Sequence, residues 1–269
     1  MFHPQDPDRP PTLVAVPTSP DAAGPIGRGE VVGRPGRSAN AYYRRRRAAE
    51  WSLYRRSFPL RLFGVVAAGL LSGIAAHEVA PALSGWVAAL TATGVLWRLR
   101  FRVSEDARNW RRGARGERRT ARQLNRLTDR GWIIVHDLAV PGSRANVDHL
   151  VIGPSGVLLI DSKNWRGRLV FAPDGTLWHG SYPMTAAIAT IGFEVAAIGG
   201  ALGTPSSAVE PLLVIHGGAI PWGEQFLGGV GILPGRQLVP TLLALPPQLS
   251  DQQITELAER AVNRLRPAL

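Results

Sequence analysis

The sequence predicts an α/β domain that follows a two-helix transmembrane hairpin and a disordered N-terminal tail. Three observations support this prediction. Residues 1–40 are rich in proline, glycine and small polar residues and show no apolar period. Residues 62–97 contain one charged side chain, Glu78, and from residue 113 onward helix-like and strand-like apolar patterns alternate.

The composition restricts the chemistry that the chain can perform. The 269 residues are 45% hydrophobic, which is enough to bury a sizeable core. The absence of cysteine excludes disulfides, thiolate zinc sites and cysteine nucleophiles. The net charge is +11, but residues 131–269 carry a net charge of −2, so the basic excess lies entirely in the first half.

Among the 31 basic residues, Lys163 is the only lysine. Arginine replaces lysine readily wherever only charge is needed, but not where the chemistry needs a compact, titratable ammonium. Lys163 is therefore the first residue for which a functional role is considered. The alternative is a surface residue without one.

The first hundred residues predict a tail and a hairpin. Residues 1–57 are interpreted as a disordered basic tail, whose start lacks the basic and apolar regions of a signal peptide. Residues 58–100 are interpreted as a transmembrane helical hairpin, because the uncharged runs Leu62–Ala76 and Val79–Trp97 approach the ~20 residues that span a bilayer. Small residues would let the two helices approach closely, namely Gly69, Gly73, Gly85, Ala88 and Ala92. A buried hairpin of a soluble protein is the alternative.

Arginine residues flank both outer ends of the hairpin, whereas the connecting turn has none. The positive-inside rule then predicts a multi-pass protein of the plasma membrane, with the N-terminus and the α/β domain in the cytoplasm. This topology explains much of the basic charge without requiring, or excluding, a nucleic-acid partner. Residues 101–112 are interpreted as a basic linker to the folded domain.

The α/β domain is expected to begin with a helix over Glu117–Asp129, which places Glu117 on the core-facing stripe. Strands are predicted at Trp132–Leu138, Val147–Ile152, Val157–Asp161, Arg168–Ala172, Leu212–Ile215 and Val230–Leu233. Thr185–Leu202 is predicted as a buried crossover helix, and the alternative of a third membrane span is opposed by Glu194 in its middle. The C-terminal helical segment, 236–269, contains an amphipathic helix over Asp251–Arg266.

The stretch 146–163 combines two apolar strands with three charged side chains. Gly153–Gly156 is typical of a hairpin turn, and a loop that is symmetric about its centre would place Asp148 opposite Asp161. Lys163 follows two residues later and therefore lies on the same face of the sheet. A loop of odd length would shift this register.

Two carboxylates that face each other on apolar strands repel and are costly to bury. A divalent cation would compensate for them, and carboxylate oxygens suit Mg²⁺ or Mn²⁺. Lys163 alongside could neutralise charge, orient an attacking water or contact a phosphate. A structural pair of Asp161 and Lys163 at a strand end is the alternative.

Three segments together resemble the nuclease-related domain (NERD) family, over roughly residues 113–235. They are Gly113-Ala114-Arg115-Gly116-Glu117, then Val147-Asp148-His149, then Ile160-Asp161-Ser162-Lys163-Asn164-Trp165-Arg166-Gly167. That family is similar to the PD-(D/E)XK nucleases, so the resemblance implies a restriction-endonuclease-like mixed central sheet flanked by helices. One departure is Asp161, because family members often carry glutamate at that position.

The resemblance implies hydrolysis of phosphodiester bonds with Mg²⁺ (or Mn²⁺) as the cofactor. The implied catalytic residues are Glu117, Asp148, Asp161 and Lys163, of which Glu117, Asp148 and Asp161 would bind the metal. Nucleic acid would be the partner, with DNA favoured over RNA. The residues expected to contact it are Arg115, Arg122, Arg166, Arg168 and Trp165, although Trp165 could instead pack in the core. His149 should point away from Asp148 and be structural.

Two functions of other classes stay open. The first is a catalytically silent membrane-tethered module with a nuclease fold that binds nucleic acid or serves as a scaffold. The second is an envelope protein whose basic flanks bind only anionic lipid. The membrane would be bound through residues 58–100 in each case, and association into a homo-oligomer is neither required nor excluded.

Overall fold

The computed structural model describes residues 26–140, 142–143, 145–218, 220 and 224–268. The chain divides into two compact units. Residues 1–41 and 109–269 form the larger unit, and residues 42–108 form the smaller one. The larger unit is therefore made of two segments that are separated in the sequence by the whole of the smaller unit.

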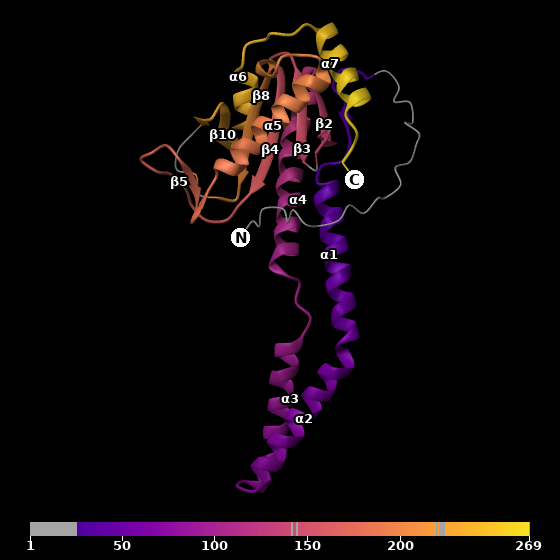
Figure 1. Ribbon diagram of the computed structural model, residues 1–269, viewed down its shortest axis with the longest axis vertical. Coiled ribbons are helices and arrows are strands. Elements are labelled where there is room, and N and C mark those ends of the chain that lie inside the picture. Colours follow the sequence, from indigo (N-terminus) through magenta and orange to yellow (C-terminus); the bar gives the residue numbers. More distant parts are fainter. Residues whose placement is uncertain (1–25, 141, 144, 219, 221–223, 269) are drawn as a thin grey trace. The chain divides into compact units, whose positions relative to one another are not determined.

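The larger unit is built around a seven-stranded mixed sheet with the strand order β1-β2-β3-β4-β8-β10-β9 (Figure 1). Its strands are β1 (Val31–Val32), β2 (Ile133–Ala139), β3 (Asn146–Gly153), β4 (Gly156–Asn164), β8 (Val209–His216), β9 (Gln225–Leu227) and β10 (Val230–Pro234). A small antiparallel sheet comprises β5 (Leu169–Phe171), β6 (Leu177–His179) and β7 (Tyr182–Pro183). The predicted mixed sheet flanked by helices is confirmed.

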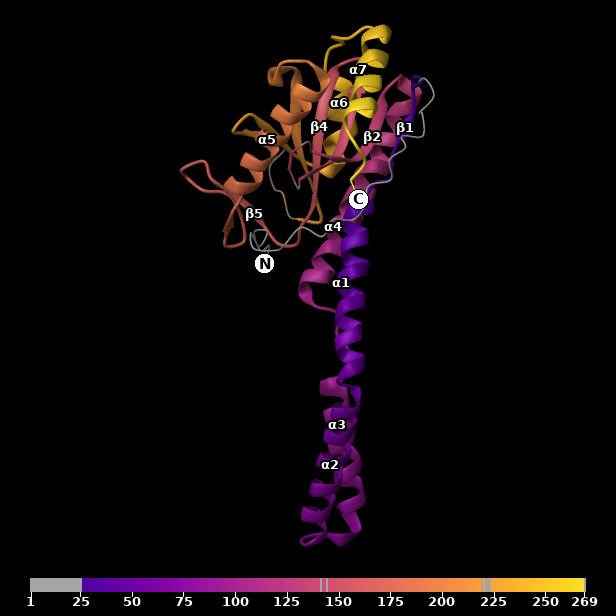
Figure 2. The ribbon, with the colours of Figure 1, turned by 45° about the vertical axis from the view of Figure 1, so that its right-hand side comes forward.

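Helices cover both faces of the large sheet. They are α4 (Glu105–Leu124), α5 (Thr185–Leu202), α6 (Leu238–Ala244) and α7 (Asp251–Arg264), with 3₁₀ turns at Asn125–Arg130, Ser206–Ala208 and Gly235–Gln237. Helices α5 and α7 lie along the sheet (Figure 2), and their apolar side chains share one core with Leu150 and Leu159. The end of α4 and α6 share a second core with Val151 and Leu158. Since neighbouring residues of a strand point to opposite faces, the central strands are buried on both sides.

Segment 236–269 is part of this unit, because α7 supplies Ile254, Leu257 and Ala261 to the first core. Pro267 also forms a bridge with Leu138 of β2. α5 has the bounds predicted from the sequence. It contributes seven buried residues, so its apolar surface packs into the domain.

The prediction that residues 1–57 are disordered is wrong for their second part. β1 pairs in parallel with β2, Ile26 is buried in the first core, and α1 (Arg37–Arg56) is a continuous helix. A strand of two residues has no periodicity of its own, and its partner lies far along the chain, so local patterns do not reveal it. Residues 1–25 of the predicted tail lie outside the described residues.

The predicted basic linker over residues 101–112 is wrong from Glu105 onward, because α4 begins there rather than at Glu117. The Ser104 hydroxyl accepts a hydrogen bond from the Ala107 backbone N–H at 3.1 Å, which caps the helix. Glu105 and Asp106 lie in its first turn, where acidic side chains favour a helix N-terminus.

The hairpin of β3 and β4 has the predicted register. Its pairs run from Gly153↔Gly156 to His149↔Ile160, so the loop is the symmetric two-residue turn. Gly156 has a φ of 123°, a backbone conformation that favours glycine. Continued by one residue, the same register places Asp148 opposite Asp161.

The smaller unit contains α2 (Phe58–His77), a 3₁₀ turn (Pro81–Leu83) and α3 (Ser84–Leu99). A Cβ added to Gly73 would lie 3.0 Å from the Ala88 Cβ, and one added to Gly69 would lie 3.2 Å from the Ala92 Cβ. These glycines therefore permit the close approach of α2 and α3, as predicted. The same prediction is wrong for Gly85, because a Cβ added there would have no neighbour within 4 Å.

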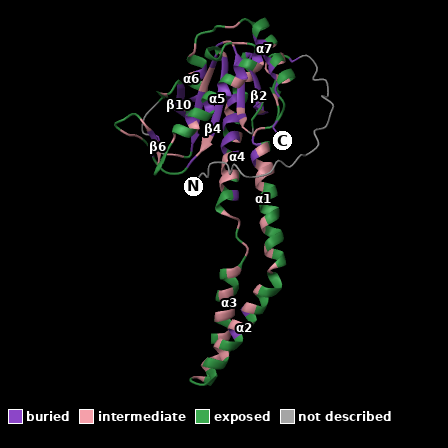
Figure 3. Ribbon diagram, viewed as in Figure 1, coloured by how far each residue is buried: buried purple, intermediate pink, exposed green. Residues whose placement is uncertain are grey.

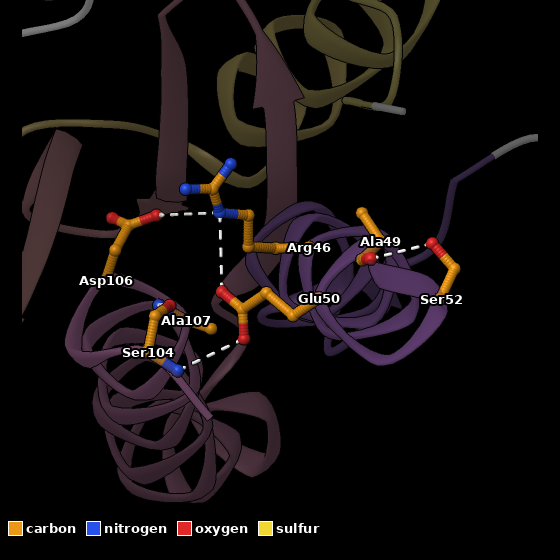
Figure 4. Close-up of polar contacts among 7 residues, drawn as sticks. All are labelled: Arg46, Ala49, Glu50, Ser52, Ser104, Asp106 and Ala107. Atoms are coloured by element: carbon orange, nitrogen blue, oxygen red, sulfur yellow. Dashed lines mark hydrogen bonds and ion pairs between the residues drawn. The ribbon is translucent and has the colours of Figure 1, made fainter. Parts of the chain in front are cut away.

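Polar contacts join the segments that flank the hairpin (Figure 4). Glu50 of α1 accepts a hydrogen bond from the Ser104 backbone N–H at 3.1 Å. Arg46 lies 3.5 Å from the Glu50 carboxylate and 3.8 Å from that of Asp106. At the base of the hairpin, Arg61 of α2 donates to the Leu99 backbone carbonyl at 2.9 Å. The two ends of the inserted segment are thus tied together.

Two helices of the described chain, α2 and α5, are long and apolar enough to cross a membrane by length and composition. In the apolar window of α5 39% of the residues are buried, against 11% in that of α2. Figure 3 shows the strands of the large sheet as buried and α2 and α3 as mostly exposed or intermediate. α3 has only 16 residues, because the turn at Pro81 takes up the start of the second uncharged run.

Candidate functional site

The ends of β3 and β4 bring together the three charged residues that the sequence analysis singled out. The Lys163 ammonium lies 2.7 Å from Asp161 Oδ1. Asp148 accepts a hydrogen bond from the Ser162 backbone N–H at 2.8 Å through Oδ2. By strand alternation these side chains lie on the face that α5 and α7 cover. The three side chains therefore share one face of the sheet, as the strand register predicts, and Asp161 and Lys163 are in direct contact.

A buried polar chain supports this strand end from the opposite face. The Ser162 hydroxyl donates to Thr120 Oγ1 of α4 at 2.8 Å, and Thr120 Oγ1 lies 2.8 Å from His216 Nε2 of β8. Ser162 thus fixes Asp148 through its backbone N–H and is itself fixed through its side chain. This arrangement orients the Asp148 carboxylate.

Glu117 reaches the site from α4 because that helix approaches β4 unusually closely. A Cβ added to Gly116 would lie 2.8 Å from the Asn164 Cβ, so only glycine fits there. Asn164 in turn donates to the Arg112 backbone carbonyl at 3.0 Å, one turn earlier in α4. The close packing of Gly116 on Asn164 explains why the glycine directly precedes Glu117.

Electrostatics show that Glu117 and Asp148 are neighbours. Burial, followed by the charge of Asp137, raises the pKa of Glu117 to about 7, although Lys163 and a hydrogen bond from the Gly36 backbone N–H act in the opposite direction. Burial and the charges of Glu117 and Asp161 raise the pKa of Asp148 well above its ordinary value. These carboxylates therefore share one poorly solvated region.

Asp137 was not predicted as a site residue, but the register of β2 and β3 places it opposite Asp148. His136↔His149 and Leu138↔Val147 are paired on either side, whereas the pair between them is missing from the ladder. With the β3–β4 register, Asp137, Asp148 and Asp161 thus form one row across three strands. Asp137 has a φ of 57°, which costs on the order of 1 kcal/mol for a residue other than glycine.

Because the backbone at Asp137 is left-handed, its carboxylate points away from Asp148 and Asp161 and toward Ser38. Its two oxygens accept hydrogen bonds from the Ser38 backbone N–H at 2.8 Å and from the Ser38 hydroxyl at 2.7 Å. Ser38 lies in the first turn of α1, which has no acidic residue of its own. Asp137 therefore stabilises the N-terminus of α1, and three cross-strand carboxylates do not face one another.

Glu194 of α5 is a further buried carboxyl at the site, with 5% of its surface exposed. Burial and the charge of Asp161 raise its pKa to about 8, and the charge of Lys163 acts against this shift. In the sequence Glu194 only counted against a third membrane span. The signal that could have identified it is that it is the only charged side chain in an otherwise apolar helix.

Lys163 is the positive group of this cluster. Burial alone would lower its pKa, but the charges of Asp161 and Asp148 outweigh burial and hold the pKa above its ordinary value. Its side chain is 27% exposed, so the cluster is not fully shielded from solvent. This geometry contains the bonded pair of Asp161 and Lys163 that was considered as the alternative. It also contains the predicted cluster of charged side chains around Lys163.

The donor set suits a hard divalent cation, because the carboxylates of Glu117, Asp148 and Asp161 offer oxygen ligands whose mutual repulsion a cation would relieve. In the hydrogen bonds to Lys163 and Ser162, each aspartate uses one oxygen. However, no three Asp, Glu or His side chains in the described part of the chain are arranged closely enough to hold one ion. The carboxylate oxygens are thus of the right chemical type for the ion, but the side chains are not spaced closely enough to bind it in this structure.

The residues predicted to contact nucleic acid divide into two groups. The four arginines, Arg115, Arg122, Arg166 and Arg168, are exposed and form no salt bridge with any described residue. Trp165 is 7% exposed and stacks on His179 with ring centroids 4.8 Å apart. The base-stacking role of Trp165 is therefore corrected to core packing, because its ring faces the protein.

His136 and His149 have structural roles. His149 is fully buried, and its Nδ1 lies 2.8 Å from that of His136 on the neighbouring strand. Burial lowers the pKa of His136 to about 4 and that of His149 well below its ordinary value, so both rings are neutral. The expected structural role of His149 agrees with this burial.

The larger unit is thus an α/β domain that gathers carboxylates around a lysine at the ends of two central strands. Residues 112–216 match the family model of the nuclease-related domain (NERD), so this part of the chain is similar to that family. A stretch of 79 residues is 27% identical to an uncharacterized protein of Bacillus anthracis, covering 28% of this chain and 37% of that protein. The chain therefore spans well under half the length of this relative. No solved structure matches the chain significantly.

Replacement of Gly116 by alanine should destabilise the larger unit by about 1–3 kcal/mol, because the added Cβ would overlap Asn164. A Cβ added to Gly113, on the same helix, would have no neighbour within 4 Å. Gly113→Ala should be neutral or stabilise by up to about 1 kcal/mol, since alanine favours helix. Urea unfolding of both variants measures the difference, and equal effects would contradict the close packing of α4 on β4.

Glu194→Gln should remove a pH-dependent loss of stability. A carboxyl whose pKa rises from 4.5 to about 8 on folding stabilises the fold fully below pH 4.5 and loses that contribution as the pH rises to about 8. The stability of the variant relative to wild type should increase across this window by at most about 1.4 kcal/mol per pH unit. Urea unfolding at about pH 5 and about pH 8.5 measures this gap, with the exposed Glu256→Gln as control. A gap that is constant with pH would refute the assignment.

Proposed function

We propose that the larger unit is a metal-dependent nuclease that hydrolyses phosphodiester bonds in nucleic acid, and that the α2–α3 hairpin anchors it in a membrane. The observation that carries this proposal is the meeting of Asp148, Asp161 and Lys163 at the ends of β3 and β4, with Glu117 beside them. The match of residues 112–216 to the nuclease-related domain supports it.

In this proposal Glu117, Asp148 and Asp161 hold Mg²⁺ or Mn²⁺, which when bound polarises a phosphoryl oxygen and lowers the pKa of a water molecule. Lys163 remains charged because its carboxylate neighbours raise its pKa, so it can stabilise negative charge that develops on the phosphate. Glu194, with a pKa of about 8, is suited to exchange a proton near neutral pH.

The substrate in this proposal is a nucleic-acid strand, with DNA favoured over RNA. Arg115 and Arg122 lie on one exposed side of α4, seven residues apart, and Arg166 and Arg168 follow the end of β4. Unpaired guanidinium groups of this kind bind backbone phosphates without reading the base sequence. Binding should therefore weaken steeply as the salt concentration rises.

The competing proposal is a catalytically silent module that binds nucleic acid without cleaving it. Two observations favour it: Lys163 already neutralises Asp161 at 2.7 Å, and no three acidic or histidine side chains among the described residues converge on one point. Salt-sensitive binding without turnover would distinguish this module from a nuclease.

The full-length wild-type protein should cleave DNA in Mg²⁺ or Mn²⁺, and Lys163→Met or Asp161→Asn should reduce kcat by about 100-fold or more. Asp174→Asn removes an exposed carboxylate outside the site and serves as the matched control. Plasmid, linear duplex and single-stranded substrates, each with and without EDTA, measure the rate and the strand preference. Absence of cleavage, or equal cleavage by the Lys163 variant, would refute the nuclease proposal.

The membrane proposal rests on the exposed apolar side chains of the hairpin. They include Leu60, Phe63, Leu70 and Leu71 of α2 and Trp86 and Leu90 of α3. Arg55, Arg98 and Arg100 are exposed beside the outer ends of these helices. With a rise of 1.5 Å per residue, α2 spans about 30 Å and α3 about 24 Å, so α3 requires thinning of the bilayer or help from the adjoining turn.

The topology can be measured directly, because the natural chain has no cysteine. If the hairpin crosses a bacterial inner membrane with both ends inside, Ala82→Cys in the turn should react with a membrane-impermeant maleimide in spheroplasts. Ala48→Cys in α1 should react only after lysis, since α1 would lie in the cytoplasm. Both residues are exposed, which makes them a matched pair. Labelling of both cysteines in intact spheroplasts would contradict the proposed topology. Recovery of the protein in the soluble fraction would contradict the anchor.

A further inference from the structure

A short segment that precedes the hairpin in the sequence touches three elements of the proposed nuclease site. Ser38 is hydrogen-bonded to Asp137 of β2, as described above, and its hydroxyl also accepts from Asn146 Nδ2 of β3 at 3.0 Å. Asn146 lies two residues before Asp148. Gly36, two residues before Ser38, donates its backbone N–H to Glu117 of α4.

The backbone of this segment is held against the domain on both sides. Gly33 has a φ of 85°, and a Cβ there would lie 2.4 Å from the His136 carbonyl oxygen of β2. Gly36 has a φ of 70°, and a Cβ there would lie 3.0 Å from the Ala114 carbonyl oxygen, one turn before Glu117. Both positions need glycine for conformation and for space. The segment therefore has one defined path rather than a loose passage.

The first turn of α1 attracts carboxylates for an electrostatic reason. The first N–H groups of a helix have no partner within the helix, and they carry the positive end of its dipole. Glu117 and Asp137, from two other elements, bind these N–H groups through Gly36 and Ser38. The same contacts fix the position of the Glu117 carboxylate, although burial and the like charges of Asp137 and Asp161 disfavour its charged form.

We propose that the segment Gly33–Ser38 is a working part of the nuclease site and that Ser38 and Asp137 are positioning residues for Glu117. This inference rests on the proposed nuclease function. It assigns to the site residues that lie outside the matched family region 112–216 and on the far side of the hairpin in the sequence. Asp137 fixes Ser38 through two hydrogen bonds, and Ser38 in turn fixes the first turn of α1. Gly36, at the start of that turn, binds Glu117 through its backbone N–H.

The test uses the full-length protein in detergent with three site variants. Ser38→Ala removes the hydroxyl but keeps the backbone N–H that bonds Asp137, and Ser38→Thr restores a hydroxyl. Asp137→Asn keeps a side chain that tolerates positive φ and removes the charge. Ser52→Ala is the matched control, because Ser52 lies on the same helix and its hydroxyl bonds only the Ala49 backbone carbonyl, at 2.8 Å (Figure 4).

The readouts are kcat and KM on linear DNA, the affinity for Mn²⁺ by calorimetry, and Tm. Ser38→Ala and Asp137→Asn should lower kcat or the Mn²⁺ affinity by about 10- to 100-fold, as the loss of a residue that orients a metal ligand does. KM should stay unchanged, because the exposed arginines are untouched. Ser38→Thr should recover most of the loss, and Ser52→Ala should match wild type.

A purely structural role for Ser38 and Asp137 would lower Tm and leave kcat and Mn²⁺ affinity of the folded protein within twofold of wild type, and this result would overturn the inference. If wild type cleaves DNA and the Ser38 and Asp137 variants keep its kcat and Mn²⁺ affinity, the inference fails but the nuclease proposal stands. If wild type binds Mn²⁺ without cleaving, the nuclease proposal fails and the Mn²⁺ affinities of the variants decide the inference. A wild-type protein that neither cleaves nor binds Mn²⁺ overturns both.

Discussion

The larger unit is organised around mutual repulsion between carboxylates that share a poorly solvated region. The strand registers bring Asp137, Asp148 and Asp161 to one level of the sheet, and helices add Glu117 and Glu194. The three aspartates each have a compensating partner. Asp161 has the ammonium of Lys163, Asp148 has a backbone N–H, and Asp137 turns away to the start of α1. Burial raises the pKa values of Glu117 and Glu194, which favours their neutral forms and also reduces buried charge.

What could be predicted from the sequence follows the range of the interactions involved. The two-residue turn of the β3–β4 hairpin and the bounds of α5 depend on neighbouring residues, so local patterns were sufficient for them. β1 was missed because its stability comes from a partner on β2 and from two glycines that fit against other elements. Asp137 was missed because nothing in the strand pattern indicates a left-handed residue. Glu194 was visible as a charge in an apolar helix, but its neighbour Asp161 was not.

The bond between Lys163 and Asp161 connects the two readings of the site. As observed, it makes a compact ion pair at a strand end, which by itself has no need of a metal. A divalent cation at the same place would compete with the ammonium for Asp161 and would release Lys163 toward a substrate phosphate. The same pair can therefore be the resting state of a nuclease or the permanent state of a binding module. Which state applies depends on whether Asp161 binds the divalent cation or the Lys163 ammonium more strongly.

The hairpin is inserted between two parts of one domain, and this arrangement affects the order of events during translation. β1 and the start of α1 leave the ribosome before the hairpin, whereas β2 and α4, to which they bind, leave after it. Domains fold as their segments become available. The N-terminal strand thus stays unpaired while the apolar hairpin is synthesised, and the carboxylate cluster can assemble only after the hairpin has been made. The apolar segment is therefore synthesised before the residues of the carboxylate cluster.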